Sequence, residues 1–266
     1  MPTPTIAETL KFANLQMAAE ALYGLVAATT ESNQPPPALR PGQPIDGLID
    51  PAWLTTGNLH ASKFTSTEAA KFAEQWTVVE HISNTTTGFS GTLLKALKND
   101  PSQNIKAGDL VLSFRSTEFL DDHARDNTAT NVLEIKEKGF AFGQLSDMED
   151  WYKSLQQGGK ITGPLSVTGY SLGGHLATAF NLLHPGVAQQ VVTFNGAGIG
   201  TIGDPALAAT PAQLPAMIAR FSALRSQGET TGFLDSFQSE AGRNAYQAIQ
   251  AHLASTLGVP RWRCRF

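Results

Sequence analysis

The pattern that most constrains the fold of this chain is a glycine-bounded pentapeptide that joins a buried strand to a helix. Residues 169–173 read Gly-Tyr-Ser-Leu-Gly, and residues 165–168 before them, Leu-Ser-Val-Thr, predict a short strand. After the pentapeptide, apolar residues recur at helical spacing until His184-Pro185-Gly186 ends the helix: Leu172, Leu176, Ala177, Phe180, Leu182 and Leu183. A strand that passes directly into a helix is typical of an α/β fold with a parallel sheet.

The two glycines and the serine between them favour one local geometry. Glycine lacks a Cβ atom, so Gly169 and Gly173 allow a sharp, strained turn that exposes the hydroxyl of Ser171. Gly174 allows close packing of the helix, and the Leu172 N–H at the helix N-terminus becomes a natural oxyanion donor. The pattern therefore predicts a serine presented as a nucleophile; the alternative is a Gly/Ser loop that only joins two core elements.

The elements around the pentapeptide predict an α/β fold. Residues 76–82 and 89–97 predict an N-terminal β-hairpin around a turn at 84–88, and 109–114 predict a strand buried on both faces. From residue 146 to residue 194 a helix, a strand, a helix and a strand follow one another, as in a parallel sheet. We expect a mostly parallel, α/β-hydrolase-like sheet flanked by helices.

The chain is long enough for one domain with a substantial core, and we expect that domain to span residues 1–266. Its first part, 1–64, contains a helix and a Pro-rich surface segment at 35–44. Its last part, 201–266, predicts a helical region without a further strand, shorter than a complete hydrolase domain would have.

Three Ser/Thr-x-x-Glu patterns predict helix starts. They begin at Thr5, Thr65 and Ser146, and each would form a capping box in which the two side chains satisfy free backbone N–H groups. The first helix should run from Thr5 to about Leu25. Its expected apolar face consists of Ile6, Leu10, Ala13, Met17 and Ala21.

Composition excludes several classes of function. A net charge of −4 and a pI of about 5.9 disfavour binding to nucleic acid or to an anionic membrane. The single cysteine, Cys264, excludes an internal disulfide framework and a cysteine-based zinc site. Neither a transmembrane run nor an ordinary secretory signal is visible, so we expect a cytoplasmic protein, or one secreted without a cleavable N-terminal signal.

A nucleophilic serine needs a histidine as base and a carboxylate to orient that histidine. His252 is the only histidine late enough in the chain for the usual order, although it falls within a predicted helix, whereas His175 and His184 suit structural positions. The candidate acids are Asp235 and, as an alternative, Asp204. Asp235 could equally cap a helix, and Asp204, before a proline, could begin a turn.

Two further groups lie after the strand at 109–114. Thr117 can offer both a backbone N–H and a hydroxyl to an oxyanion, or can satisfy its own turn. Asp121, Asp122, His123 and Asp126 follow, but they lack the glycine and spacing of a known cation loop. We interpret this segment as part of a solvated lid at 119–131 and expect no metal.

Three blocks together resemble the class 3, fungal-type lipase group of the α/β-hydrolases, as found in bacterial lipases. Residues 111–118 resemble its strand and oxyanion block, 167–174 its nucleophile turn, and 191–196 its next strand and glycine turn. The resemblance covers about residues 76–200 and implies hydrolysis of lipid-like esters through an acyl-enzyme, without a cofactor. Ser171 matches the nucleophile, and Leu172 and Thr117 match the oxyanion positions.

The chain also departs from that group. Ser116 replaces the glycine usual in the oxyanion block, and Tyr170 replaces the histidine common before the nucleophile. No position after residue 200 clearly matches the group's acid and base, so we expect an atypical member in which these are non-standard or absent. Two alternatives stay open: an impaired hydrolase-like module that binds a partner or lipid, and an acyltransferase that uses the same serine. The sequence does not define the oligomeric state.

Overall fold

The fold is seen in a computed structural model of the chain. It describes residues 4–21, 23, 44–55, 63–83, 85, 87–117, 130, 135, 139–199, 215, 216 and 219. Nearly all of the predicted helical region at 201–266, most of the predicted lid and the Pro-rich segment before residue 44 lie outside these residues. The described part includes the whole of the pentapeptide at 169–173, with the strand before it and the helix after it.

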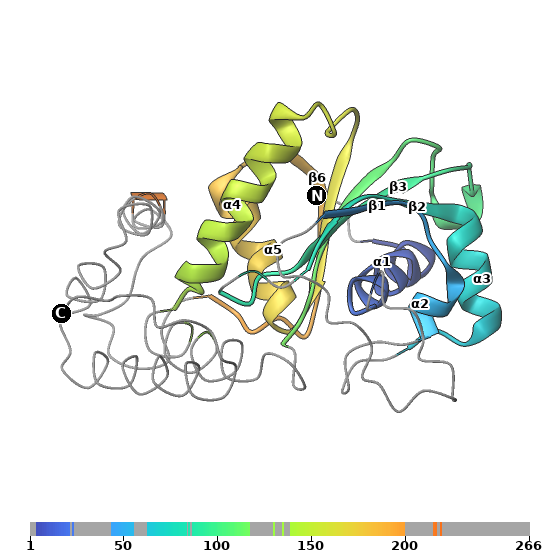
Figure 1. The fold of residues 1–266 in the computed structure, drawn as a ribbon, viewed down its shortest axis with the longest axis horizontal. Helices are drawn as coiled ribbons and strands as arrows, with labels where there is room; N and C mark the ends of the chain where they lie inside the picture. The colour runs from blue at the N-terminus through green and yellow to red at the C-terminus, as the bar shows by residue number, and fades with distance from the viewer. Residues whose placement is uncertain are drawn as a thin grey trace.

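A six-stranded mixed sheet forms the centre of the protein, with its strands in chain order from one edge to the other (Figure 1). The strands are β1 (Pro44–Leu48), β2 (Trp76–Ile82), β3 (Gly91–Ala96), β4 (Leu110–Phe114), β5 (Leu165–Tyr170) and β6 (Ala188–Phe194). The prediction of an α/β fold is confirmed. β1 was not predicted, because it follows directly on the Pro-rich segment.

The expectation of a mostly parallel sheet is wrong. The pairs β1/β2, β2/β3 and β3/β4 are antiparallel, and only β4/β5 and β5/β6 are parallel. A parallel pair needs a long crossover connection, which is usually a helix. The links from β4 to β5 and from β5 to β6 each contain a helix, α4 (Phe142–Gln157) and α5 (Leu172–Leu183), respectively. The link from β1 to β2 also contains helices, α2 (Pro51–Thr55) and α3 (Ser66–Gln75), but it joins an antiparallel pair. Part of the 84–88 turn between β2 and β3 lies outside the described residues, so the hairpin stays a prediction.

Helices cover both faces of the sheet (Figure 1). One face carries α4 (Phe142–Gln157) and α5 (Leu172–Leu183), and the other carries α1 (Ile6–Ala19), α2 (Pro51–Thr55) and α3 (Ser66–Gln75). A short 3₁₀ turn, η1 (Pro101–Gln103), lies between β3 and β4. None of the helices in this part of the chain is long and apolar enough to cross a bilayer.

Two of the three predicted helix starts are confirmed. The capping boxes of α1 and α3 both form, with Thr5 Oγ1 accepting from the Glu8 N–H at 3.2 Å and Thr65 doing the same for Glu68. The third is wrong, because α4 begins at Phe142 and Ser146 is buried in its second turn. Phe142 is a core residue, so tertiary packing extends the helix ahead of the local capping signal.

The predicted apolar face of α1 is wrong at Ile6 and Leu10, although Met17 and Ala21 do contact the core. The helix ends at Ala19 rather than near residue 25. Ile6 is 91% exposed and Leu10 54% exposed, whereas Phe12 and Leu15 are fully buried. The helix α1 carries apolar residues on two of its faces, so its sequence allows two different faces to pack on the sheet. The stripe with the larger Phe12 side chain packs on the sheet because it removes more apolar surface from water.

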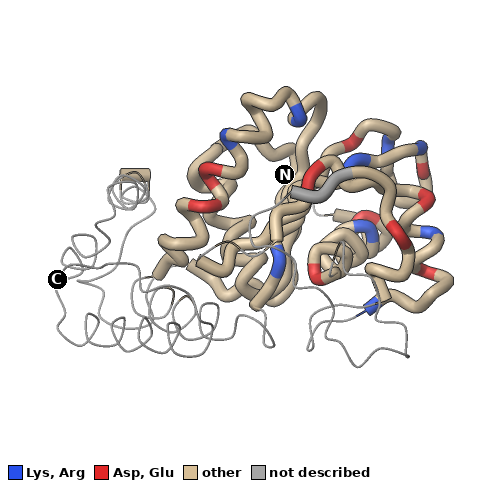
Figure 2. Tube along the Cα trace, viewed as in Figure 1, with Lys and Arg blue, Asp and Glu red and all other residues tan. Residues whose placement is uncertain are grey.

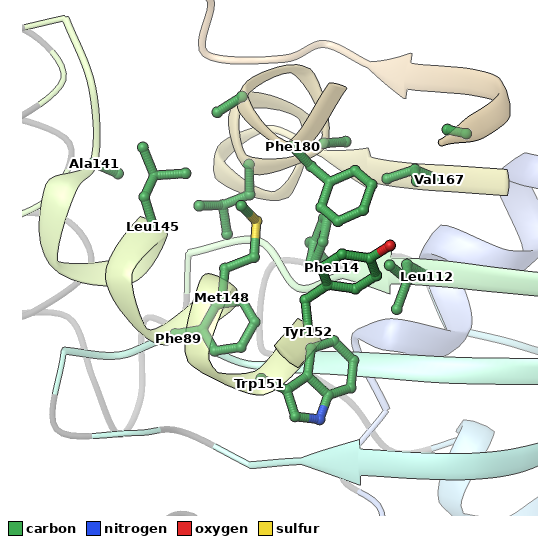
Figure 3. Close-up of a cluster of buried hydrophobic side chains, with 14 of the residues drawn as sticks. Phe89, Leu112, Phe114, Ala141, Leu145, Met148, Trp151, Tyr152, Val167 and Phe180 are labelled. Atoms are coloured by element: carbon green, nitrogen blue, oxygen red, sulfur yellow. The ribbon is translucent and has the colours of Figure 1, made fainter. Parts of the chain in front are cut away.

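The two faces of the sheet form separate cores. Figure 3 shows the aromatic centre of the first core between the sheet and the helices α4 and α5. Its ring contacts join Phe89 to Phe114 and Trp151, and Tyr152 to Phe180, with centroid separations of 4.9–6.0 Å. The second core packs α1, α2 and α3 against the other face. Together the cores hold the ends of β4, β5 and β6 in place.

Acidic and basic residues are interspersed along the described chain (Figure 2). This distribution agrees with the small net charge of −4. Binding to a polyanion is favoured by cations gathered on one face, and the described residues do not form such a face in this view.

Candidate active site

Ser171 occupies a strained turn between β5 and α5. β5 ends at Tyr170, α5 begins at Leu172, and Ser171 alone links them with φ 51° and ψ −115°. A residue with a side chain rarely adopts a positive φ. Such a conformation costs about 1–3 kcal/mol and persists only where its surroundings enforce it. The predicted sharp turn is therefore present, and Ser171 itself, not a glycine, carries the strain.

Backbone hydrogen bonds hold this turn against the neighbouring strand. The Ser171 N–H donates to the Phe194 carbonyl at 3.0 Å, at the end of β6. The Ser171 carbonyl accepts from the N–H groups of His175, at 3.1 Å, and Ala197, at 3.0 Å. Three bonds thus fix the peptide groups on both sides of the serine, which is what a strained conformation requires in order to persist.

Each glycine of the turn allows a close backbone approach. A Cβ atom on Gly169 would lie 2.2 Å from the Gly173 carbonyl oxygen, so the strand and the helix meet at these two residues. A Cβ on Gly173 would lie 2.2 Å from the carbonyl oxygen of Phe114, the last residue of β4. A Cβ on Gly174 would lie 2.8 Å from the Cα of Gly196. The helix therefore packs directly onto the ends of β4 and β6.

The helix N-terminus lies immediately beside the serine. Leu172 is the first residue of α5, so its N–H has no intrahelical acceptor, and its side chain is buried. Ser171 is half-buried and Tyr170 is exposed, so the turn lies at the protein surface. An oxygen that develops negative charge near Ser171 would meet the positive end of the helix dipole.

Residues 115–117 leave the sheet at the same edge as Ser171. β4 and β5 are parallel, and Phe114 is paired with Gly169, so the chain after β4 emerges beside the serine turn. The Gly173 Cβ position is 2.9 Å from the Arg115 carbonyl oxygen, which brings this loop against α5. Thr117, the predicted second oxyanion donor, is buried in this loop.

The C-terminus of α1 holds the loop at residues 115–117 through hydrogen bonds. The Arg115 guanidinium donates from Nε to the Ala19 carbonyl at 3.1 Å and from Nη2 to the Ala21 carbonyl at 2.6 Å. The Ser116 N–H donates to the Glu20 carboxylate at 2.8 Å. The contacts between Arg115, Glu20 and the helix end were not predicted, since no local pattern pairs residues so far apart in the chain.

His175 is a buried link between three segments. Its Nδ1 donates to the Gly198 carbonyl at 2.5 Å, and its Nε2 accepts from the Ala141 N–H, at the start of α4, at 3.1 Å. These partners require a neutral ring with the proton on Nδ1. Burial lowers the pKa of His175 to about 4, in agreement with this assignment. With both nitrogens engaged, His175 does not act as a base for Ser171 here.

We expect His175 to make the protein less stable in acid. Between pH 6.5 and about pH 4 the unfolded chain binds a proton on this histidine and the folded chain does not, so the free energy of unfolding falls as the pH is lowered. The shift corresponds to about 3 kcal/mol over this window. Urea unfolding of the wild-type protein and of His175→Gln at several pH values measures the effect.

The variant should show a shallower dependence of stability on pH than the wild type. His81 is also buried, and burial together with the Arg115 cation lowers its pKa well below the usual value. His81→Gln should therefore flatten the curve in the same direction. Identical pH profiles for His175→Gln and the wild type would contradict the assignment.

The other described histidines are engaged away from Ser171. His184, after α5, pairs through Nε2 with the Glu149 carboxylate of α4 at 2.6 Å. His81, on β2, contacts Thr92 Oγ1 through Nδ1 at 2.9 Å. Within the described residues, then, the hydrogen bonds of the His81, His175 and His184 side chains go to groups other than Ser171.

The remaining predicted site residues lie outside the described part of the chain. They are the candidate base His252, the candidate acids Asp235 and Asp204, and the cluster Asp121, Asp122, His123 and Asp126. In the part that is described, no group of His, Cys, Asp and Glu side chains is arranged to hold a metal ion.

Searches against protein-family models, curated proteins and solved structures found no match to this chain.

Proposed function

We propose that this chain is a carboxylic ester hydrolase of the lipase or esterase type, similar to the class 3 lipases, with Ser171 as its nucleophile. The observation that carries the proposal is the backbone of Ser171, at φ 51° and ψ −115° between β5 and the first residue of α5. Backbone strain of this kind persists only where the surrounding structure enforces it, and it concentrates at functional sites, which supports a nucleophilic role for Ser171.

In the proposed reaction, Ser171 Oγ attacks the ester carbonyl carbon and loses its proton to a base. The carbonyl oxygen becomes an oxyanion, which the N–H of Leu172 and the N–H and hydroxyl of Thr117 stabilise. The alcohol then leaves with a proton, and water releases the acyl group from the serine. The chemistry needs no cofactor. The exposed Tyr170 ring beside the serine suits an apolar part of the substrate.

The base and the acid of this reaction are assigned to His252 and Asp235, with Asp204 as the alternative acid. The engagement of His81, His175 and His184 elsewhere supports a base from outside the described residues. Single alanine substitutions at His252, Asp235 and Asp204 test the assignment through turnover of a p-nitrophenyl ester. Near-complete losses at His252 and one aspartate show an intact triad, and unchanged rates show that the acid and base are non-standard or absent.

A fluorophosphonate probe tests the nucleophile. It should label the folded wild-type protein once, and peptide mass spectrometry should locate the label on Ser171, because the probe reacts with activated serines. Ser171→Ala should not be labelled. A folded wild-type protein that resists the probe would contradict the proposal and favour a non-catalytic binding module. If transfer to an added alcohol exceeds hydrolysis, the same serine serves an acyltransferase.

A further inference from the structure

Glu20 is a buried carboxylate in direct contact with the loop that carries Thr117. It caps the C-terminus of α1, is 2% exposed, and its Oε1 accepts the Ser116 N–H at 2.8 Å. The contact joins residues 96 positions apart in the chain. Ser116 stands immediately before Thr117, so this bond fixes the Arg115–Ser116 peptide group, one peptide group before the one that carries the Thr117 N–H.

The position of Glu20 is unfavourable for stability on two grounds. A carboxylate at a helix C-terminus faces the negative end of the helix dipole. A carboxylate removed from water also loses its hydration, which costs several kcal/mol unless a cation and hydrogen bonds replace it. Residues that break the rules of stability in this way are expected mainly at functional sites.

Arg115 provides the compensating charge. Arg115 is 4% exposed, and its guanidinium donates to the carbonyls of Ala19 and Ala21, the residues on either side of Glu20. A cation at the end of α1 offsets both the dipole and the carboxylate. Arg115 and Ser116 thus bind one helix end through a side chain and a backbone N–H, respectively.

Hydrogen bonds also hold the residues that lead from β4 into this loop. Ser113 Oγ, on β4, donates to the Leu15 carbonyl of α1 at 3.0 Å, and the Arg115 N–H donates to the Ser90 carbonyl at 3.1 Å. The backbone from residue 113 to residue 116 is therefore anchored at three points by contacts with α1 and with the chain before β3. Glu20 supplies the last of these anchors before Thr117.

We propose that Glu20 is a positioning residue for the oxyanion loop: its carboxylate oxygen orients the Arg115–Ser116 peptide group and so holds Thr117 beside Ser171. The inference rests on the proposed esterase function. The role belongs to the acceptor oxygen, since Arg115 offsets the charge. The N-terminal helix α1 then helps to position the site, although it contains none of the reacting groups.

Three substitutions at Glu20 separate position from charge. Glu20→Gln keeps an acceptor oxygen at the same reach and removes the charge. Glu20→Asp keeps the charge and withdraws the acceptor by one methylene, and Glu20→Ala removes both. We expect Glu20→Ala and Glu20→Asp to lower kcat for a p-nitrophenyl ester by about 10- to 100-fold with KM little changed, because a displaced oxyanion donor acts in the transition state. Glu20→Gln should stay within about threefold of the wild-type kcat.

Glu80→Ala is the matched control. Glu80 is buried too, and it accepts from Trp151 Nε1 at 2.6 Å and Lys160 Nζ at 2.5 Å, on the face of the sheet opposite α1. Its loss should lower stability and leave kcat unchanged. A wild-type kcat in folded Glu20→Asp, or an equal loss in Glu20→Gln and Glu20→Ala, would overturn the positioning role.

Hydrogen exchange of the Ser116 amide gives a readout that does not depend on activity. Exchange should become faster by about tenfold or more in Glu20→Asp and Glu20→Ala and should stay slow in Glu20→Gln. Unchanged exchange of the Ser116 amide in all three variants would refute the positioning role of Glu20, whether or not the protein is an esterase. A wild-type protein without turnover or serine labelling would instead refute the esterase function, so the two failures are distinguishable.

Discussion

Replacing Ser171 by alanine is expected to lower kcat/KM for a p-nitrophenyl ester by about 10⁴-fold or more. The Ser171 hydroxyl forms the covalent bond to the acyl group, and alanine leaves no nucleophilic atom at this position. The oxyanion donors at Leu172 and Thr117 are retained in the variant, so a small residual rate above that of water should persist. Initial rates measured over a range of ester concentrations give kcat and KM separately.

Ser166→Ala is the control for this substitution. Ser166 is half-buried on β5, the same strand that leads into the turn, and it lies before the glycines. Its variant should retain the wild-type rate. If Ser171→Ala kept more than a tenth of the wild-type kcat/KM, the serine would not be the nucleophile, and the esterase proposal would be wrong.

Gly173→Ala is expected to lower the free energy of unfolding by roughly 3 kcal/mol or more, whereas a change from glycine to alanine within a helix usually raises it. Alanine within a helix normally stabilises by up to about 1 kcal/mol relative to glycine. Here the new Cβ would lie 2.2 Å from the Phe114 carbonyl oxygen and 2.9 Å from that of Arg115. Both are backbone atoms at the end of β4 and cannot rotate away, so α5 must shift. Urea unfolding measures the loss.

Gly163→Ala is the matched control, since a Cβ there would meet only the Gly108 carbonyl oxygen, at 3.6 Å, an ordinary contact distance. Its free energy of unfolding should stay within about 0.5 kcal/mol of the wild type. Equal stability of Gly173→Ala and the wild type would mean that α5 does not pack on the end of β4 as described. A folded but inactive Gly173→Ala protein would show that the distance between α5 and the 115–117 loop matters for catalysis.

Local signals predicted much of the backbone. The strand β2 was predicted with its observed bounds, Trp76–Ile82, and the capping boxes at Thr5 and Thr65 mark the starts of α1 and α3. The turn at Ser171 was also visible in the sequence, because its glycines, its strand and its helix lie within a few residues of one another. In each of these cases the residues that interact are close neighbours in the chain.

Other features could not be predicted because they depend on which segments pack together. The antiparallel pairing of β1 with β2 and of β3 with β4, the buried face of α1 and the early start of α4 at Phe142 all follow from burial against distant residues. Two stripes of α1 are apolar in the sequence, and only the finished sheet selects the one that carries Phe12.

The tight turn that carries Ser171 between a strand and a helix can be predicted from local sequence, because it depends on Gly169 and Gly173, two residues away on either side. The contacts that hold the site follow from tertiary packing instead. The Ser116 N–H bonds to Glu20, and the Arg115 guanidinium to the neighbouring Ala21 carbonyl, across nearly a hundred residues, and His175 joins α5 to Ala141 and Gly198. The physical reason is that buried polar groups must find hydrogen-bond partners wherever the fold brings them. Those partners are chosen by the packing of the two cores, which no short stretch of sequence contains.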